Sequence, residues 1–188
     1  ECDEETLFNE VLADKRNLEQ LFEQEVVGYA YPYGCYHDLA VKVLSDCGIR
    51  YARTVESVAE FGLQKDLLRF KPCYHHNDDR IFEGIEQFLS LETKEPALLY
   101  IWGHSYEFAQ DDSWSHINDI CNRLQGREDV WYATNMEIYA YVTAMRSLVI
   151  SVEGDILYNP SAVTLYVRAG GQTLALGAGE RKKLDAAL

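Results

Sequence analysis

Apolar residues recur at helical spacing in five stretches of the chain, with polar and charged residues between them. This spacing predicts helices over residues 4–24, 38–47, 80–91, 113–125 and 136–146. Short apolar runs predict strands at residues 26–30, 49–54, 67–73, 98–102 and 130–133. Residues 55–66 are weakly patterned, and we expect a loop with some helix there. Strands that alternate with helices across short connections are typical of a parallel sheet or barrel, so we expect an α/β fold.

The pattern changes after residue 147. Short apolar segments and glycine pairs predict β-hairpins in place of alternating helices and strands. We therefore expect two parts. Residues 1–147 form a partial (β/α) barrel, and residues 148–188 form a small antiparallel β-hairpin appendage packed on it.

The run from Leu98 to Trp102 marks the centre of the first part. It is almost unbroken in apolar residues, which suits a strand buried on both faces. Gly103 ends the run and His104 follows at once. Because α/β folds place their chemistry just past the carboxyl ends of strands, His104 is a candidate catalytic residue. The alternative is a core histidine bonded to a backbone carbonyl.

Three loops follow three predicted strands and are expected on one face. They hold side chains suited to proton transfer or metal binding: Tyr33, His37, Asp38, His75, His76, Asp78, Asp79, His104, Tyr106 and Glu107. None of the spacings is a metal-binding motif. We expect the adjacent His75 and His76 to point in different directions, so that at most one faces a given site. We expect His116, within a predicted helix, to lie on the surface.

The charge balance narrows the class of partner. The chain has 31 acidic and 17 basic residues, a formal net charge of −14. This argues against nucleic acid or an anionic membrane surface as partner. No segment is long and apolar enough to cross a bilayer.

The cysteines and the start of the chain bear on its context. Five cysteines, at 2, 35, 47, 73 and 121, are odd in number and widely spaced, which favours free thiols in a reducing compartment such as the cytoplasm. The first methionine is Met136, so we expect the natural N-terminus to be missing, and any targeting segment with it.

Several motifs, in order, resemble one family. Tyr29-Ala-Tyr-Pro-Tyr-Gly34, a helix and then Cys47-Gly-Ile-Arg-Tyr-Ala-Arg-Thr54 resemble the third motif region of polysaccharide deacetylases (the NodB-homology domain, carbohydrate esterase family four). A bacterial branch of that family is similar at three further stretches: Phe70-Lys-Pro-Cys-Tyr-His-His-Asn-Asp78, Trp102-Gly-His-Ser-Tyr-Glu-Phe108 and Tyr158-Asn-Pro-Ser-Ala162.

The resemblance implies an irregular (β/α) barrel that removes N-acetyl groups from carbohydrate with a divalent metal, usually zinc, and an aspartate base. Carried over, the backbone N–H of Tyr33 is the oxyanion donor and His104 protonates the leaving amine. Trp102 lines the acyl pocket. We further expect Tyr106, His75 and Asp78 to contact the carbohydrate substrate.

The family's metal ligands have no counterpart in this sequence. Its first motif, a strand ending in paired aspartates, and its second, a His-x-x-x-His loop, are both absent. The arginine usual at the head of the third motif is Ala30, and the Asp-Trp pattern of the fourth is replaced by the loop of His75 and His76. We therefore expect an incomplete barrel that is inactive as given and holds no metal.

Two alternatives remain at the level of sequence. One is a non-catalytic relative that binds a glycan in the same groove, with Tyr33, Trp102 and Tyr106 as stacking platforms. The other is a different hydrolase site, built from the histidine and carboxylate loops, that needs nothing upstream. A barrel without its first strands exposes a sheet edge, so we also expect a homodimer formed through that edge.

Overall fold

The computed structural model describes residues 3–184, so Cys2 lies outside the described part. The fold is mixed α/β, and its strands form four small sheets with no closed barrel among the described residues. Contacts divide the chain into two compact units, Glu1–Trp131 and Tyr132–Leu188. The last helix therefore groups with the hairpins, although the sequence pattern changes only after it.

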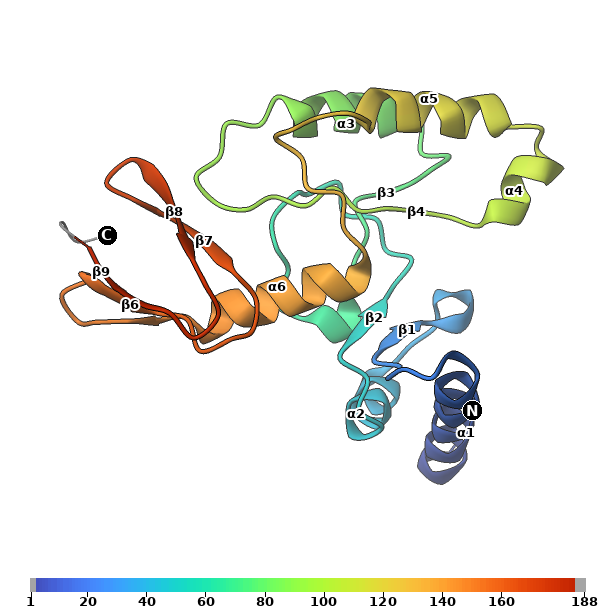
Figure 1. Ribbon diagram of the computed structural model, residues 1–188. Helices are drawn as coiled ribbons and strands as arrows, with labels where there is room; N and C mark the ends of the chain where they lie inside the picture. Colours follow the sequence, from blue (N-terminus) through green and yellow to red (C-terminus); the bar gives the residue numbers. More distant parts are fainter. Residues whose placement is uncertain (1–2, 185–188) are drawn as a thin grey trace. The chain divides into compact units, whose positions relative to one another are not determined.

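Six α-helices occur within residues 3–184 (Figure 1). They are α1 (Glu4–Phe22), α2 (Asp38–Asp46), α3 (Ile81–Leu89), α4 (Ser105–Gln110), α5 (Trp114–Leu124) and α6 (Asn135–Ser147). Five of them confirm the helices predicted from apolar spacing. The short α4 was not predicted, and it begins directly after His104.

The first unit contains two pairs of parallel strands. β1 (Gly28–Ala30) pairs with β2 (Tyr51–Arg53), and β3 (Tyr74–His75) pairs with β4 (Ile101–Trp102). Parallel pairing follows because a helix or long crossover connects the strands of each pair.

The second unit confirms the predicted hairpins. All its strand pairs are antiparallel. The strands are β5 (Val149–Ile150), β6 (Ile156–Tyr158), β7 (Leu165–Ala169), β8 (Gln172–Leu176) and β9 (Arg181–Lys183).

Two predicted strands are wrong. Residues 67–73 begin as a 3₁₀ turn, Leu67–Arg69, because the Asp66 carboxylate accepts the Leu68 N–H at 3.0 Å. Only Phe70 then makes a bridge, to Arg53. Residues 130–133 form no strand at all. Strand-forming side chains there have no half-buried sheet surface to fit.

The central apolar run is also less buried than expected. Residues 97–102 are all partly exposed, and only Ile101–Trp102 forms β4. The prediction of a strand buried on both faces is therefore wrong. The weakly patterned residues 55–66 contain no helix.

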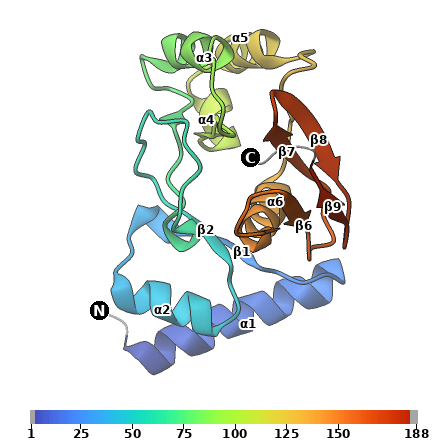
Figure 2. The ribbon, with the colours of Figure 1, turned by 90° about the vertical axis from the view of Figure 1, so that its left-hand side faces the viewer.

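The amphipathic helices cover the parallel strand pairs in the first unit. α1 and α2 lie side by side beside β1 and β2 (Figure 2), and their apolar faces share a core with the β2 residue Ala52. A second core joins α3 and α5 to β3 through Ile81, Ile85, Ile120 and Tyr74. These cores fix the positions of the strand ends.

A buried asparagine organises the second unit. Asn159 is fully buried, and its amide donates to the carbonyls of Val163, Leu176 and Gly177 at 2.8–3.0 Å. Its carbonyl oxygen accepts the Ser161 N–H at 3.0 Å. The hydrogen bonds of Asn159 thus give the Tyr158-Asn-Pro-Ser-Ala162 stretch a structural role in this unit.

The cysteines of the described part, Cys35, Cys47, Cys73 and Cys121, are all free thiols. None of the helices within residues 3–184 is long and apolar enough to span a bilayer.

Candidate functional site

Contacts between β2 and β4 connect the two strand pairs at their carboxyl ends. β1 and β2 end together at Ala30 and Arg53, and β3 and β4 end together at His75 and Trp102. The Arg53 guanidinium lies 4.7 Å from the centroid of the Trp102 ring, a cation–π contact. The Trp102 indole N–H donates to the Ser57 hydroxyl at 3.2 Å. The loops that follow the strands are thereby linked to one another.

Three side chains meet next to Trp102. The Nε2 atom of His76 lies 2.6 Å from Oε2 of Glu107, and the Nε2 atom of His75 lies 3.4 Å from the same oxygen. One ligand-type atom from each of the three residues lies within 4.8 Å of the others. We call these residues the His–His–Glu cluster.

The prediction that His75 and His76 face different sites is wrong. Side chains alternate only within a strand, and His75 is the last residue of β3. His76 follows at the turn toward α3, so its ring swings to the same side. The two ring centroids lie 4.4 Å apart, with an interplanar angle of 32°.

Close packing holds the His76 ring in place. It is 2% exposed and lies 4.7 Å from the Phe108 ring, centroid to centroid. Gly103 makes room for it, since a Cβ at this position would lie 2.0 Å from Cδ2 of His76. His116 donates from Nε2 to the His76 carbonyl at 2.6 Å and packs on Phe82. His116, expected on the surface, is therefore partly buried and partly exposed.

Glu107 is fixed from a different direction. Its carboxylate accepts the backbone N–H of His104 at 3.0 Å, which caps the start of α4. Burial alone would raise the pKa of the Glu107 carboxyl, but the hydrogen bonds from His104 and His76 outweigh it and hold the pKa below its usual value. Burial, and then the neighbouring His76, lowers the pKa of His75. Near neutral pH the cluster therefore combines an ionised carboxylate with a neutral His75 imidazole.

His104 lies at the edge of the cluster and is exposed. Its ring stacks on Tyr106 with centroids 5.1 Å apart and an angle of 10°. The Trp102 ring meets it edge-on at 6.0 Å. The alternative of a core histidine bonded to a backbone carbonyl is wrong for His104, and it is the partly buried His116 that bonds a backbone carbonyl, that of His76.

Tyr33 has an unusual backbone conformation after β1. Its φ is 56°, in the left-handed region that bulky residues rarely adopt, and its side chain is 100% exposed. The Tyr33 N–H makes no hydrogen bond within residues 3–184. Gly34 packs directly against Val55 of the loop after β2. A strained residue with a free backbone donor is a feature that functional sites share.

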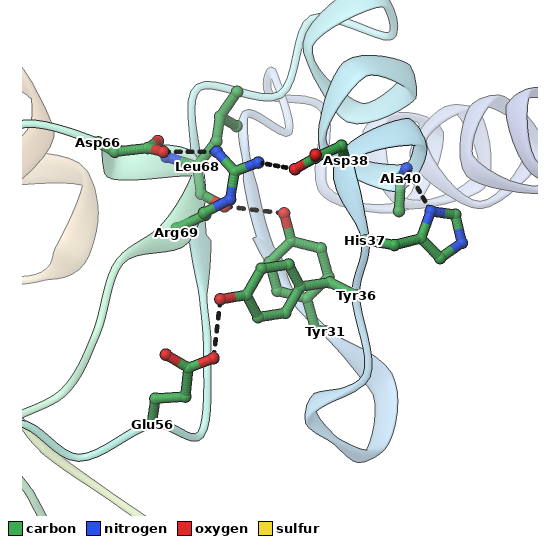
Figure 3. Close-up of polar contacts among 9 residues, drawn as sticks. All are labelled: Tyr31, Tyr36, His37, Asp38, Ala40, Glu56, Asp66, Leu68 and Arg69. Atoms are coloured by element: carbon green, nitrogen blue, oxygen red, sulfur yellow. Dashed lines mark hydrogen bonds and ion pairs between the residues drawn. The ribbon is translucent and has the colours of Figure 1, made fainter.

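The structure does not bring every predicted residue to the cluster. His37 and Asp38 belong to a separate polar network around the start of α2 (Figure 3). His37 caps that helix by accepting the Ala40 N–H at 3.3 Å, while the Asp38 carboxylate binds the Arg69 guanidinium at 2.6 Å.

Asp78 is engaged in another local contact. Its carboxylate accepts both the backbone N–H and the guanidinium of Arg80, at 2.8–3.0 Å. The hydrogen bond with the Arg80 guanidinium lowers its pKa. Asp78 therefore helps to start α3, and its role as a substrate contact stays a prediction.

His76 and Glu107 were candidates only as members of loops suited to proton transfer or metal binding, and Arg53 was not a candidate. A signal for Glu107 was present, because a glutamate three residues after a helix N-cap completes a capping box. It was hidden because the apolar spacing predicted no helix at residues 105–110, so His104 was not recognised as a helix N-cap. His76 and Arg53 owe their roles to strand pairing, which the sequence does not display.

The metal ligands implied by the family resemblance do not fit this chain. They require a strand that ends in an aspartate pair, followed by a His-x-x-x-His loop, both ahead of the third motif region, and the sequence shows neither motif there. What the described site offers is an exposed imidazole, a free backbone donor, an aromatic surface and the His–His–Glu cluster.

Comparison with protein-family models, with curated proteins and with solved structures gives no match to this chain.

Proposed function

We propose that this chain carries part of the active site of a carbohydrate de-N-acylase, with His104 as the acid that protonates the leaving amine. The observation that carries the proposal is the linkage of the strand ends through Arg53, Trp102 and Ser57. It joins the end of β2, which pairs with β1 ahead of Tyr33, to the end of β4, which pairs with β3 ahead of His76. This order of loops agrees with the order of motifs that resembles polysaccharide deacetylases. The finer fold that goes with this proposal is an incomplete irregular (β/α) barrel.

The chemistry assigned to each residue follows from its surroundings. Hydrolysis of an amide needs a proton on the departing nitrogen, and the exposed His104 imidazole supplies it. The negative charge that develops on the carbonyl oxygen is stabilised by a backbone donor, for which the unbonded Tyr33 N–H is available. Trp102 and Tyr106 offer ring faces on which a sugar stacks.

Substitution of His104 tests this assignment. In the natural full-length protein, His104→Ala should lower the rate of acetate release from N-acetylglucosamine oligomers by about 10²–10⁴. His37→Ala is the matched control, because His37 is an exposed histidine outside the cluster. Amine products are counted by fluorescent labelling. Equal rates for His104→Ala and His37→Ala would remove His104 from the mechanism.

A non-catalytic glycan-binding protein is the second candidate. The observation that favours it is aromatic exposure, since Tyr33 is fully exposed and Tyr106 is 57% exposed. The coding sequence directly upstream of residue 1 distinguishes the two. An Asp-Asp strand and a His-x-x-x-His loop there support the enzyme, and their absence supports the binding protein.

A further inference from the structure

We infer that His75, His76 and Glu107 form a divalent-cation site suited to zinc, built entirely from residues of this chain. The inference differs from the sequence-based expectation of no metal. It also differs from the ligand set that the family resemblance implies, since it uses no residue before β3. It does not rest on the proposed function, because metal binding is measured directly.

The donor atoms are of the right kind and at suitable separations. Two imidazoles and one carboxylate are a ligand set that zinc enzymes use. Ligand atoms about 2.0–2.1 Å from a tetrahedral zinc lie roughly 3.3–3.4 Å from one another. In the cluster, Oε2 of Glu107 lies 3.4 Å from Nε2 of His75 and 2.6 Å from Nε2 of His76. One ligand-type atom from each of the three residues lies within 4.8 Å of the other two. To hold the ion, Nε2 of His76 and Oε2 of Glu107 need only move apart from their present separation of 2.6 Å.

The ligands are already held in place. The His76 ring is enclosed by Phe108 and by the backbone at Gly103. The His75 ring meets Trp102 edge-on at 4.5 Å. The Glu107 carboxylate is tied to the His104 backbone. Such fixed side chains lose little conformational freedom when they bind an ion.

The two ring nitrogens of His76 differ in their surroundings, and this difference indicates which of them would bind the ion. Its Nδ1 atom is buried and has no hydrogen-bond partner among the described residues. Buried polar atoms are rarely left in this state. Because Nδ1 makes no favourable contact, packing and the contact of Nε2 with Glu107 determine the ring orientation. Nε2 is therefore the atom that the fold positions.

The site also has room for a fourth ligand. The side chains of His75 and Glu107 are 25% and 21% exposed, whereas His76 closes the inner side. A tetrahedral ion held by three protein ligands keeps one position for water or substrate. In this chain His75 and Glu107 are the partly exposed members of the cluster, so water reaches the site from their side.

Zinc binding by the untagged chain tests the inference. The protein is treated with EDTA, dialysed and titrated with Zn²⁺ in the presence of a chromophoric chelator, and the metal content is then measured by mass spectrometry. We expect one Zn²⁺ per chain. Co²⁺ in its place should give the visible absorption bands of a tetrahedral site.

Variants locate the site. Glu107→Gln keeps an oxygen that accepts the His104 N–H, and His75→Ala removes a partly exposed ring, so both should fold. Each should bind Zn²⁺ at least about 100-fold more weakly than the parent chain, whereas the exposed-histidine variant His37→Ala should bind it equally. Circular dichroism of the metal-free proteins checks the fold. The inference is overturned if the parent chain binds no Zn²⁺, or if Glu107→Gln and His75→Ala bind it as tightly as His37→Ala does.

Discussion

At the residue scale, the Glu107 carboxylate takes part both in a helix cap and in the His–His–Glu cluster. Glu107 caps the first turn of α4 through the His104 backbone and also faces both imidazoles of the cluster. The position of the proposed acid therefore depends on the same side chain that orients the cluster. A substitution at Glu107 should affect both, whereas a substitution at His104 leaves the cluster's three ligands in place.

Gly103 is the residue whose size the cluster depends on most. Gly103→Ala would place a Cβ atom 2.0 Å from Cδ2 of the buried His76 ring, which has no free space to move into. Overpacking of this kind costs about 1–3 kcal/mol of the free energy of unfolding. Urea denaturation measures the difference. Gly62→Ala is the control, because a Cβ there meets nothing within 4 Å. Equal stability of the two variants would contradict this account of Gly103.

The sequence predicted the individual site residues unevenly. His104 was recognisable because it follows an apolar run and a glycine. The meeting of His75 with His76 was not, because the strand ends between them and the alternation rule no longer applies. Tyr33 was identified from its motif, while its left-handed backbone is visible only in three dimensions.

At the element scale, α6 shows how local sequence fixes a helix boundary. The Thr134 hydroxyl accepts the Glu137 N–H at 3.3 Å, and the Glu137 carboxylate accepts the Thr134 N–H at 2.7 Å. This reciprocal capping box satisfies two donors that the helix itself cannot. α6 therefore begins at a position set by two side chains.

Removal of the cap should weaken the second unit. Thr134→Ala is expected to lower the free energy of unfolding by about 1 kcal/mol, the usual cost of losing such a cap. Thr143→Ala, at an exposed position within α6, should leave stability unchanged or slightly higher because alanine favours helix. Thermal denaturation followed by circular dichroism compares the two. The same melting temperature for both variants would exclude a capping role.

Helices were easier to predict than strands. An amphipathic helix shows its apolar face in its own sequence, so five of the helices were found. The parallel strands are two or three residues long and depend on partners distant in sequence. The segments 67–73 and 130–133 have strand-forming residues without such partners, and neither forms a strand over its predicted length.

At the scale of the whole molecule, the mixed α/β architecture was predictable from the alternation of patterns, and so was the change to hairpins. Whether the strands close into a barrel could not be predicted, because closure depends on pairing between strands that are distant in sequence. Within the described residues, β1 pairs with β2 alone. The homodimer through an exposed strand edge stays a prediction, which solution scattering at micromolar concentration checks.

The central claim is that the linked strand ends bind an N-acylated carbohydrate. Its most direct test is an NMR titration of the ¹⁵N-labelled chain with an N-acetylglucosamine tetramer, and separately with the glucose tetramer of the same linkage. We predict saturable shifts of the Trp102 indole N–H and of the Tyr33 and His104 amides with the acetylated sugar alone. No shift at these three positions, or equal shifts with both sugars, would contradict the account.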